Sequence, residues 1–164
     1  MPSEPAPTKA ELLRALRASR DEVVAVVRAL APAALEGGGY EHGWNGRQIL
    51  AHIASIEWTY PRLLDVAHEP GTQPTREMRG GNDAYNERQV AKRAHCSVVE
   101  LLEEFDRNRA ATIAAVEAAD AALLARPIRS AGGVTGPLAA VLHQVAVQHV
   151  LGHARDIAGP AGRR

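Results

Sequence analysis

The sequence predicts an all-α protein built as a four-helix bundle with one long crossover connection. Alanine is the commonest residue and only 4% of the residues are aromatic, a composition that favours helices over strands. Apolar residues recur at helical spacing over four long stretches, which are separated by segments rich in glycine or proline. A chain of 164 residues can bury one core, so we expect a single domain over residues 8–158 with flexible termini at 1–7 and 159–164.

The first helix is predicted from residue 8 to residue 30. Thr8 and Glu11 have the spacing of a capping box, in which each side chain bonds a free backbone amide at the helix start. Leucine and valine then follow at helical intervals as far as Leu30. Three consecutive glycines at 37–39 indicate that the chain leaves the helix before them.

The second helix is predicted to begin after Asn45 and to continue to about residue 67. Asn45 is a favourable N-cap, and Gln48 stands at the position that completes a capping box. Trp44 and Ile49 occupy the two positions of a hydrophobic staple. Pro61 lies inside this stretch, where it removes a backbone donor, so we expect a kink there.

The long crossover connection between the second and third long helices is predicted to begin at residue 69. Residues 69–81 are rich in proline, glycine, threonine and charge, which predicts a loop. Asn82 is expected to cap a short helix that reaches Val90. Ser97 and Glu100 have capping-box spacing, and they predict a long helix to about Ala118.

The last long helix is predicted from Thr135 to residue 158. The preceding segment, 120–136, contains a proline and a glycine pair and is expected to be irregular. Thr135 is the expected cap, and Pro137 stands near the first turn, where a missing amide has no consequence. Gly159 followed by Pro160 predicts the end of this helix.

The charge and cysteine content exclude several classes of protein. The 19 basic residues balance the 19 acidic ones, whereas a nucleic-acid-binding surface normally gives a basic excess. Cys96 is the one cysteine, which excludes a disulfide framework and a thiolate zinc cluster. No apolar run approaches the ~20 residues of a membrane span, and the polar start is unlike a secretory signal. We therefore expect a cytoplasmic protein that acts on neither nucleic acid nor membranes.

Two histidines in the last predicted helix are the strongest chemical signal. His149 and His153 are four residues apart, so they differ by only ~40° around a regular helix. At ~100° per residue, Leu138, Leu142 and Val145 share their face, which predicts that both rings continue the buried stripe. Two neutral rings in a core need partners for four ring nitrogens, and a metal ion satisfies one nitrogen of each. The alternative is a pair of histidines that only pack.

A third histidine supports the metal interpretation. His52 shares a face of the second predicted helix with Ile56 and Leu63, so it is expected to point into the core. Facing helices of a bundle can bring His52, His149 and His153 together. Three protein ligands leave an open coordination position, as in catalytic rather than structural zinc sites. All-imidazole ligation favours zinc or nickel over iron or manganese.

The order of three motifs resembles the DinB/YfiT-like superfamily of four-helix bundles. The motifs are Trp44-Asn45-Gly46-Arg47-Gln48-Ile49-Leu50-Ala51-His52-Ile53, Asn82-Asp83-Ala84-Tyr85-Asn86 and His149-Val150-Leu151-Gly152-His153-Ala154-Arg155-Asp156-Ile157. The resemblance implies a divalent metal held by one histidine of the second helix and the HxxxH pair of the last, here His52, His149 and His153. It also implies a homodimer, and a reaction with a low-molecular-weight thiol such as mycothiol or bacillithiol. In the similar maleylpyruvate isomerase branch, a glutamate replaces the residue equivalent to His149.

Three further residues are candidates for the surroundings of the site. Asp156 follows His153 by three residues, so its carboxylate is placed to accept a ring N–H, although pairing with Arg155 is the alternative. Trp44 is expected in the core, where it is also placed to wall a pocket beside His52. His42 is expected to overhang the site from its loop.

Other polar residues are assigned to the surface or to helix faces. Glu57 lies ~140° from His52 around the helix, so we do not expect it to reach the metal. Arg109 is within helical pairing distance of acidic neighbours, of which Glu104 is one. His143 is expected to flank the core or meet solvent.

These observations lead to two functional hypotheses. The first is a metal-dependent enzyme, a thiol-dependent transferase or isomerase or a hydrolase, whose substrate is a small molecule attracted as an anion by the positive site. The second is a metal-binding or stress-related helical module without turnover. No dedicated general base accompanies the histidines in the sequence, unlike the glutamate of HExxH enzymes.

Overall fold

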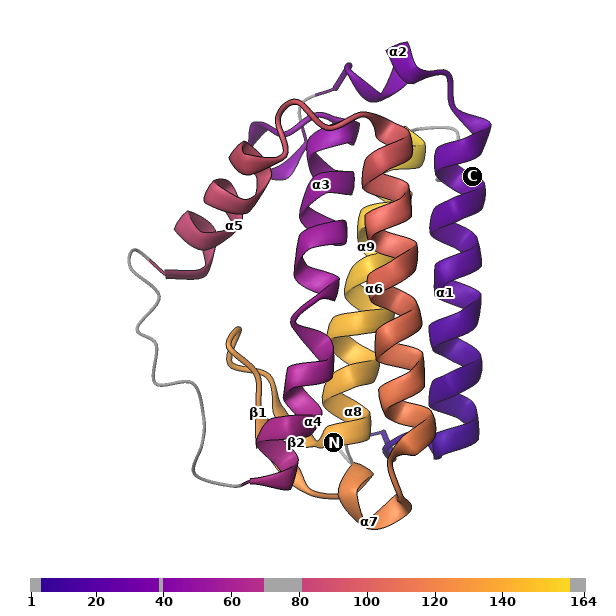
Figure 1. The fold of residues 1–164 in the computed structure, drawn as a ribbon, viewed down its shortest axis with the longest axis vertical. Helices are drawn as coiled ribbons and strands as arrows, with labels where there is room; N and C mark the ends of the chain where they lie inside the picture. Colours follow the sequence, from indigo (N-terminus) through magenta and orange to yellow (C-terminus); the bar gives the residue numbers. More distant parts are fainter. Residues whose placement is uncertain (1–3, 39, 70–80, 160–164) are drawn as a thin grey trace.

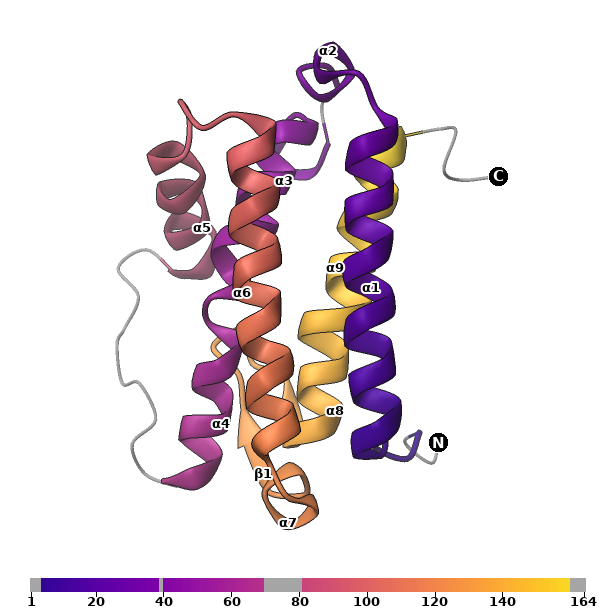
Figure 2. The ribbon, with the colours of Figure 1, turned by 45° about the vertical axis from the view of Figure 1, so that its right-hand side comes forward.

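The computed structural model describes residues 4–38, 40–69 and 81–159, and it confirms the all-α bundle. Four long helical segments lie side by side (Figure 1 and Figure 2). They are α1 (Lys9–Ala29), α3 continued by α4 (Gly46–Glu57 and Tyr60–His68), α6 (Val98–Ala118), and a last segment of α8, η2 and α9 (Leu138–Leu142, His143–Gln148 and His149–Ala158). Both α1 and α3 contact α6 and α9.

The crossover lies between α4 and α6. Figure 1 shows that α3 and α6 run in the same direction, so the chain returns to the end of the bundle where α3 begins. The described part of this connection contains α5 (Gly81–Lys92), which leans outward from α3. Most of the loop predicted at 69–81 lies outside the described residues, as do 1–3 and 160–164 of the expected termini.

The three predicted capping boxes are confirmed. The side chains of Thr8, Asn45 and Ser97 each accept a backbone N–H, and the glutamate or glutamine three residues later accepts the N–H of the cap. These bonds satisfy amides that have no partner inside the helix. They fix where α1, α3 and α6 begin. The start of α3, the helix that carries His52, is therefore determined by residues within one turn of it.

Replacing Asn45 by alanine is expected to lower the free energy of unfolding by about 1 kcal/mol, because the backbone N–H of Gln48 loses its acceptor, Asn45 Oδ1. Urea denaturation measures the change. Asn45→Ser is the matched control, since serine also caps helices well. Equal losses in both variants would contradict a capping role for this side chain.

The kink of the second long segment lies before Pro61 rather than at it. Helix α3 ends at Glu57 and α4 begins at Tyr60, so Pro61 stands in the first turn of the new helix. A proline inside a helix clashes with the carbonyl four residues earlier and cannot donate to it. The break therefore comes about one turn upstream, and the proline occupies a position where its missing amide is harmless.

Three predictions about the connections are wrong. Asn82 lies inside α5 instead of capping it, and its Nδ2 donates to the carbonyl of Ala131 at 3.3 Å. Segment 120–136 is ordered into α7 (Ala121–Leu124) and a hairpin of β1 (Pro127–Arg129) and β2 (Thr135–Pro137). Thr135 is therefore a strand residue, paired with Arg129, and the last helix begins at Leu138. Two short helices that the sequence did not indicate are α2 (Pro32–Leu35) and η1 (Glu41–Gly43).

The last helical segment contains a π-helical stretch, η2, directly before His149. A π turn holds one more residue than an α turn, so it rotates the next part of the helix by the angle of about one residue, roughly 100°. Leu138 and Leu142 are buried as predicted, but the buried stripe then continues one residue later than regular spacing requires. It passes through Ala146, Val150, Ala154 and Ile157. The prediction that His149 continues the buried stripe is wrong for this reason.

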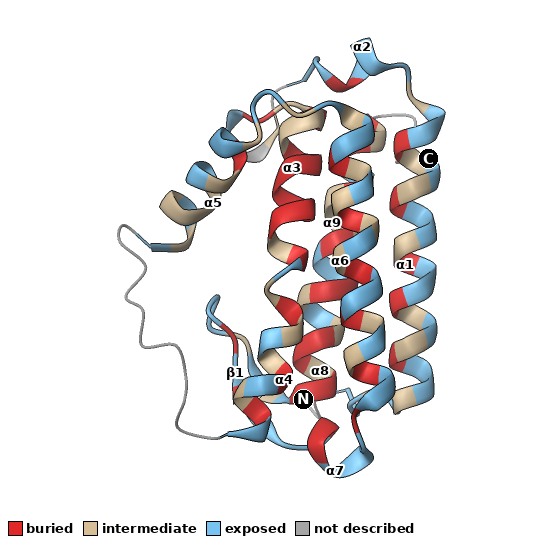
Figure 3. Ribbon diagram, in the orientation of Figure 1, coloured by how far each residue is buried: buried red, intermediate tan, exposed pale blue. Residues whose placement is uncertain are grey.

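The core fills the bundle along its length (Figure 3). One cluster of buried apolar residues joins α1, α4 and α8, and a second joins α3, α6 and α9. Trp44 and Ile49, the predicted staple pair, both belong to the second cluster. His52 is buried on α3, which contributes several residues to this second cluster. In the described ranges, no helix combines the length and hydropathy needed to cross a membrane.

Candidate metal centre

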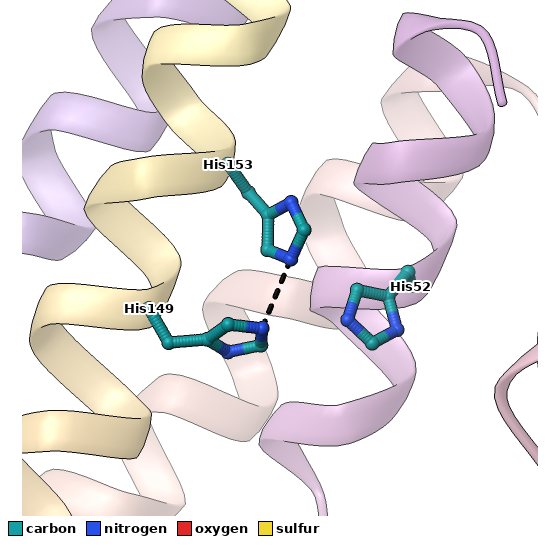
Figure 4. A group of neighbouring side chains, drawn as sticks. All are labelled: His52, His149 and His153. Carbon is teal, nitrogen blue, oxygen red and sulfur yellow. Dashed lines mark hydrogen bonds between the residues drawn. The ribbon is translucent and has the colours of Figure 1, made fainter. Parts of the chain in front are cut away.

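Three histidine rings meet between α3 and α9 (Figure 4). One nitrogen from each of His52, His149 and His153 lies within 4.8 Å of the others. The ring centroids are 5.6 Å apart for His52 and His149, 5.0 Å for His52 and His153, and 4.5 Å for the pair on α9. The three residues predicted from the sequence as one group are therefore neighbours in space.

The two helices contribute different parts of this arrangement. His149 and His153 are one turn apart on α9, and their Nε2 atoms approach to 2.9 Å. His52 projects from the middle of α3, which contacts α9 directly. Because two helices supply the three rings, the group exists only when the bundle is folded.

The group spans the boundary between the core and solvent. His52 is buried with 3% of its surface exposed, His153 is half-buried and His149 is exposed. The π turn that precedes His149 places its ring at the solvent edge of the cluster, where it still faces the buried ring of His52. Small molecules can therefore reach the cluster from the His149 side.

Burial keeps the deeper two rings neutral. The pKa of His52 is lowered to about 3, mainly by desolvation and further by the rings of His153, His149 and His42. The pKa of His153 is lowered to about 4 by the same causes, with His149 and His42 as the neighbours. At neutral pH both imidazoles are therefore unprotonated, which is the state that a metal ligand requires.

The outer nitrogens show how well the residues fit a metal ion. The Nδ1 atoms of His52 and His153 are buried and have no hydrogen-bond partner among the described residues. The nearest oxygen of Asp156, Oδ2, lies 3.8 Å from Nδ1 of His153, which is beyond hydrogen-bond distance. These outer nitrogens are thus not hydrogen-bonded to other described side chains, and three imidazoles are a donor set suited to a divalent metal ion.

Trp44 and His42 form an aromatic wall beside the cluster. The Trp44 ring lies 5.3 Å from the His52 ring, and the His42 ring lies 5.0 Å from Trp44. Trp44 is buried, and its Nε1 donates to Glu87 at 3.1 Å. His42 is exposed in η1 with φ of 64°, a left-handed conformation uncommon for a residue other than glycine. Trp44 therefore lies beside His52, and His42 lies beside Trp44.

A buried ionic network that joins α3 and α6 was not predicted from the sequence. Glu57 and Arg109 are fully buried and form a two-bond ion pair, with distances of 2.6 and 3.1 Å. Thr112 donates to the same carboxylate at 3.1 Å. Arg109 therefore does not pair with its helical neighbours, and Glu104 pairs with Arg93 instead. The signal in the sequence was an arginine and a glutamate each placed on the apolar face of its helix.

Acid is expected to destabilise the metal-free protein between about pH 6.5 and pH 4. In the unfolded chain, histidines titrate near the ordinary value of 6.5, whereas in the folded protein the pKa is about 3 for His52 and about 4 for His153. The unfolded state then binds more protons than the folded state in this window, so the free energy of unfolding falls as the pH falls.

Urea denaturation at a series of pH values with a chelator present measures this slope. A His153→Gln variant, which cannot titrate there, should give a shallower slope than the exposed-site control His68→Gln. The same slope in both variants would contradict the assignment of the acid sensitivity to the cluster.

Comparisons with known proteins give one family and one fold. The family model described as the mycothiol maleylpyruvate isomerase N-terminal domain matches residues 16–158. The crystal structure of the mycothiol-dependent maleylpyruvate isomerase superposes with a TM-score of 0.76 at 16% identity, covering 92% of this chain. This chain spans 61% of the length of that isomerase chain.

A second solved structure is similar over nearly its whole length. YfiT from Bacillus subtilis, described as a probable metal-dependent hydrolase with an unusual four-helix bundle topology, superposes with a TM-score of 0.75 at 16% identity. The alignment covers 99% of this chain and 92% of YfiT. No curated protein sequence matches the chain. At these identities the two structures establish the fold.

Proposed function

Because this chain belongs to the family of the mycothiol maleylpyruvate isomerase N-terminal domain, within the DinB/YfiT-like superfamily that its motifs indicate, we propose that it is a divalent-metal-dependent enzyme. Its metal ligands in this proposal are His52, His149 and His153. The observation that carries the proposal is the approach of three imidazole nitrogens to within 4.8 Å, with one of the three rings exposed.

The chemistry of the donor set favours catalysis over a closed structural site. Three protein ligands leave a coordination position for a small molecule, and the exposed His149 gives access to it. A zinc or nickel ion bound there supplies Lewis acidity and lowers the pKa of a thiol or water that binds to it. Since an imidazole that binds a metal is neutral, the ligands do not compensate the positive charge of the site, which then favours an anionic substrate or thiolate.

The protein's own residues would orient the reactants. Trp44 lies beside His52 and His42 lies beside Trp44, so this side of the cluster offers aromatic surface to the apolar part of a substrate. Asp156 lies 3.8 Å from the outer nitrogen of His153, so a small movement would let it accept the ring N–H and hold the ring.

Of the reaction classes, thiol-dependent transfer or isomerisation is the one that the family supports best. The matched family is described by a mycothiol-dependent isomerase, and the match extends over most of the chain. The thiol of this proposal is mycothiol or bacillithiol. Hydrolysis is the second candidate, because the YfiT structure of nearly the same length is described as a probable metal-dependent hydrolase.

The test begins with the purified protein and its metal content. Elemental analysis is expected to find zinc or nickel in the wild type and to find it lost in His149→Ala. With mycothiol or bacillithiol and an electrophilic substrate, the loaded protein is expected to turn over, and a chelator is expected to abolish turnover. Metal binding without turnover in any thiol or hydrolysis assay would favour the non-catalytic metal-binding module. Absence of bound metal in the wild type would overturn the proposal.

The proposal also includes a homodimer in the cytoplasm. Light scattering coupled to size-exclusion chromatography distinguishes a dimer from the 17.5-kDa monomer. A monomer at all concentrations tested would remove the dimer from the proposal and leave the metal site unaffected.

A further inference from the structure

The π-helical stretch before His149 carries a backbone carbonyl that has lost its helical partner. In an α-helix, the N–H of His149 would donate to the carbonyl of Val145, four residues earlier. Here it donates to the carbonyl of Gln144, five residues earlier. The Val145 carbonyl is therefore released from the α-helical pattern at the residue where the proposed metal ligands begin.

A tyrosine from another helix takes the place of the lost donor. The hydroxyl of Tyr60, in α4, donates to the Val145 carbonyl at 2.7 Å. Tyr60 is buried, and burial raises the pKa of its hydroxyl far above the ordinary value, so the group remains a donor. A buried carbonyl without a donor is costly, so this bond stabilises the π turn relative to a regular α-helical turn.

The next carbonyl is held in the same way by the buried arginine. Nη2 of Arg109 donates to the Ala146 carbonyl at 2.5 Å. The guanidinium itself is fixed by Glu57, by the Leu16 carbonyl at 3.0 Å and by Ser19 Oγ at 2.8 Å. The π turn is thus connected by two side chains to α4 and α6, neither of which supplies a histidine to the cluster.

The direction of the two α9 histidines depends on this turn. Without its additional residue, His149 would rotate by roughly 100° toward the core, to the position that regular helical spacing predicts. With it, Ala146 and Val150 enter the core and His149 faces the ring of His52. We propose that Tyr60, together with Arg109, is a positioning residue that maintains the π turn and so aims His149 and His153 at His52. This inference rests on the proposed metal site.

Cobalt binding to the full chain tests the proposal. Tyr60→Phe removes only the hydroxyl, and it is expected to weaken Co²⁺ affinity roughly 10-fold or more and to change the visible absorption of the bound ion. The matched control is Thr112→Val, which removes a buried hydrogen bond from the same network without touching the π turn. It is expected to lose comparable stability but to keep the Co²⁺ affinity and spectrum. Wild-type affinity and spectrum in Tyr60→Phe would overturn the inference.

Amide hydrogen exchange provides a readout that needs no metal. In Tyr60→Phe the exchange protection of the His149 amide is expected to change by at least about 10-fold relative to wild type, and in Thr112→Val to remain as in wild type. If the wild type binds no Co²⁺, the proposed metal site fails, and this exchange measurement still decides whether Tyr60 holds the turn. Unchanged protection of that amide in Tyr60→Phe would show that the apolar stripe alone maintains the turn, and it would overturn the inference.

Discussion

Replacing His52 by alanine is expected to weaken zinc or nickel binding by at least about 100-fold. His52 is the one ring of the cluster that comes from α3, so its loss leaves two ligands on a single helix. Even residues that only support metal ligands cost 10–100-fold in affinity when replaced, and a ligand should cost more. Competition against a chromophoric chelator measures the affinity.

The control for this experiment is another histidine. His68 is exposed at the end of α4, so His68→Ala is expected to bind metal as the wild type does. Bound metal also raises the melting temperature of a folded protein, and this rise should disappear in His52→Ala. Unchanged affinity in His52→Ala would remove it from the ligand set.

The second large effect is expected from the buried ion pair. Replacing Arg109 by methionine should lower the free energy of unfolding by about 3–5 kcal/mol, because it leaves the Glu57 carboxylate buried without its cation. The carbonyls of Leu16 and Ala146 lose a donor in the same step. Urea denaturation at neutral pH, with a chelator present, measures the loss without a contribution from metal binding.

A double variant separates the pair from the rest of the network. Combining Arg109→Met with Glu57→Leu removes both charges, and apolar replacements of a buried pair are often neutral. We therefore expect the double variant to be more stable than Arg109→Met alone. A double variant that loses the sum of the two single losses would show that the charges contribute independently, contrary to the ion-pair interpretation.

The parts of the fold that were predicted well are those decided within a few residues. The caps at Thr8, Asn45 and Ser97 involve partners three residues away, so local spacing was sufficient to place them. The hairpin at 127–137 was not predicted. Its strands are three residues long and carry little alternation. Ile128 of β1 packs into a core cluster, so tertiary contacts rather than local propensity account for the hairpin.

Membership of the candidate site was predictable for a similar reason. An HxxxH pair on one helix and a histidine in an apolar helix are local patterns, and a bundle offers few ways to bring them together. The burial of each ring was harder to predict, since His149 is exposed where the helical repeat predicted a buried residue. The Glu57–Arg109 pair joins residues 52 positions apart, and no local spacing indicates such a partner.

The amino-acid sequence alone was enough to predict which residues cap α1, α3 and α6, which three histidines form one group in the bundle, and the family to which the chain belongs. The π turn that precedes His149 and His153 in the last helical segment is instead determined by tertiary packing. Helical periodicity implies a constant angle per residue, and the π turn departs from that angle. The bond that supports the turn comes from Tyr60, 85 residues earlier, and the core accepts Ala146 and Val150 only with the additional residue in place. Such a choice depends on packing and on distant hydrogen bonds, which exist only once the helices have come together.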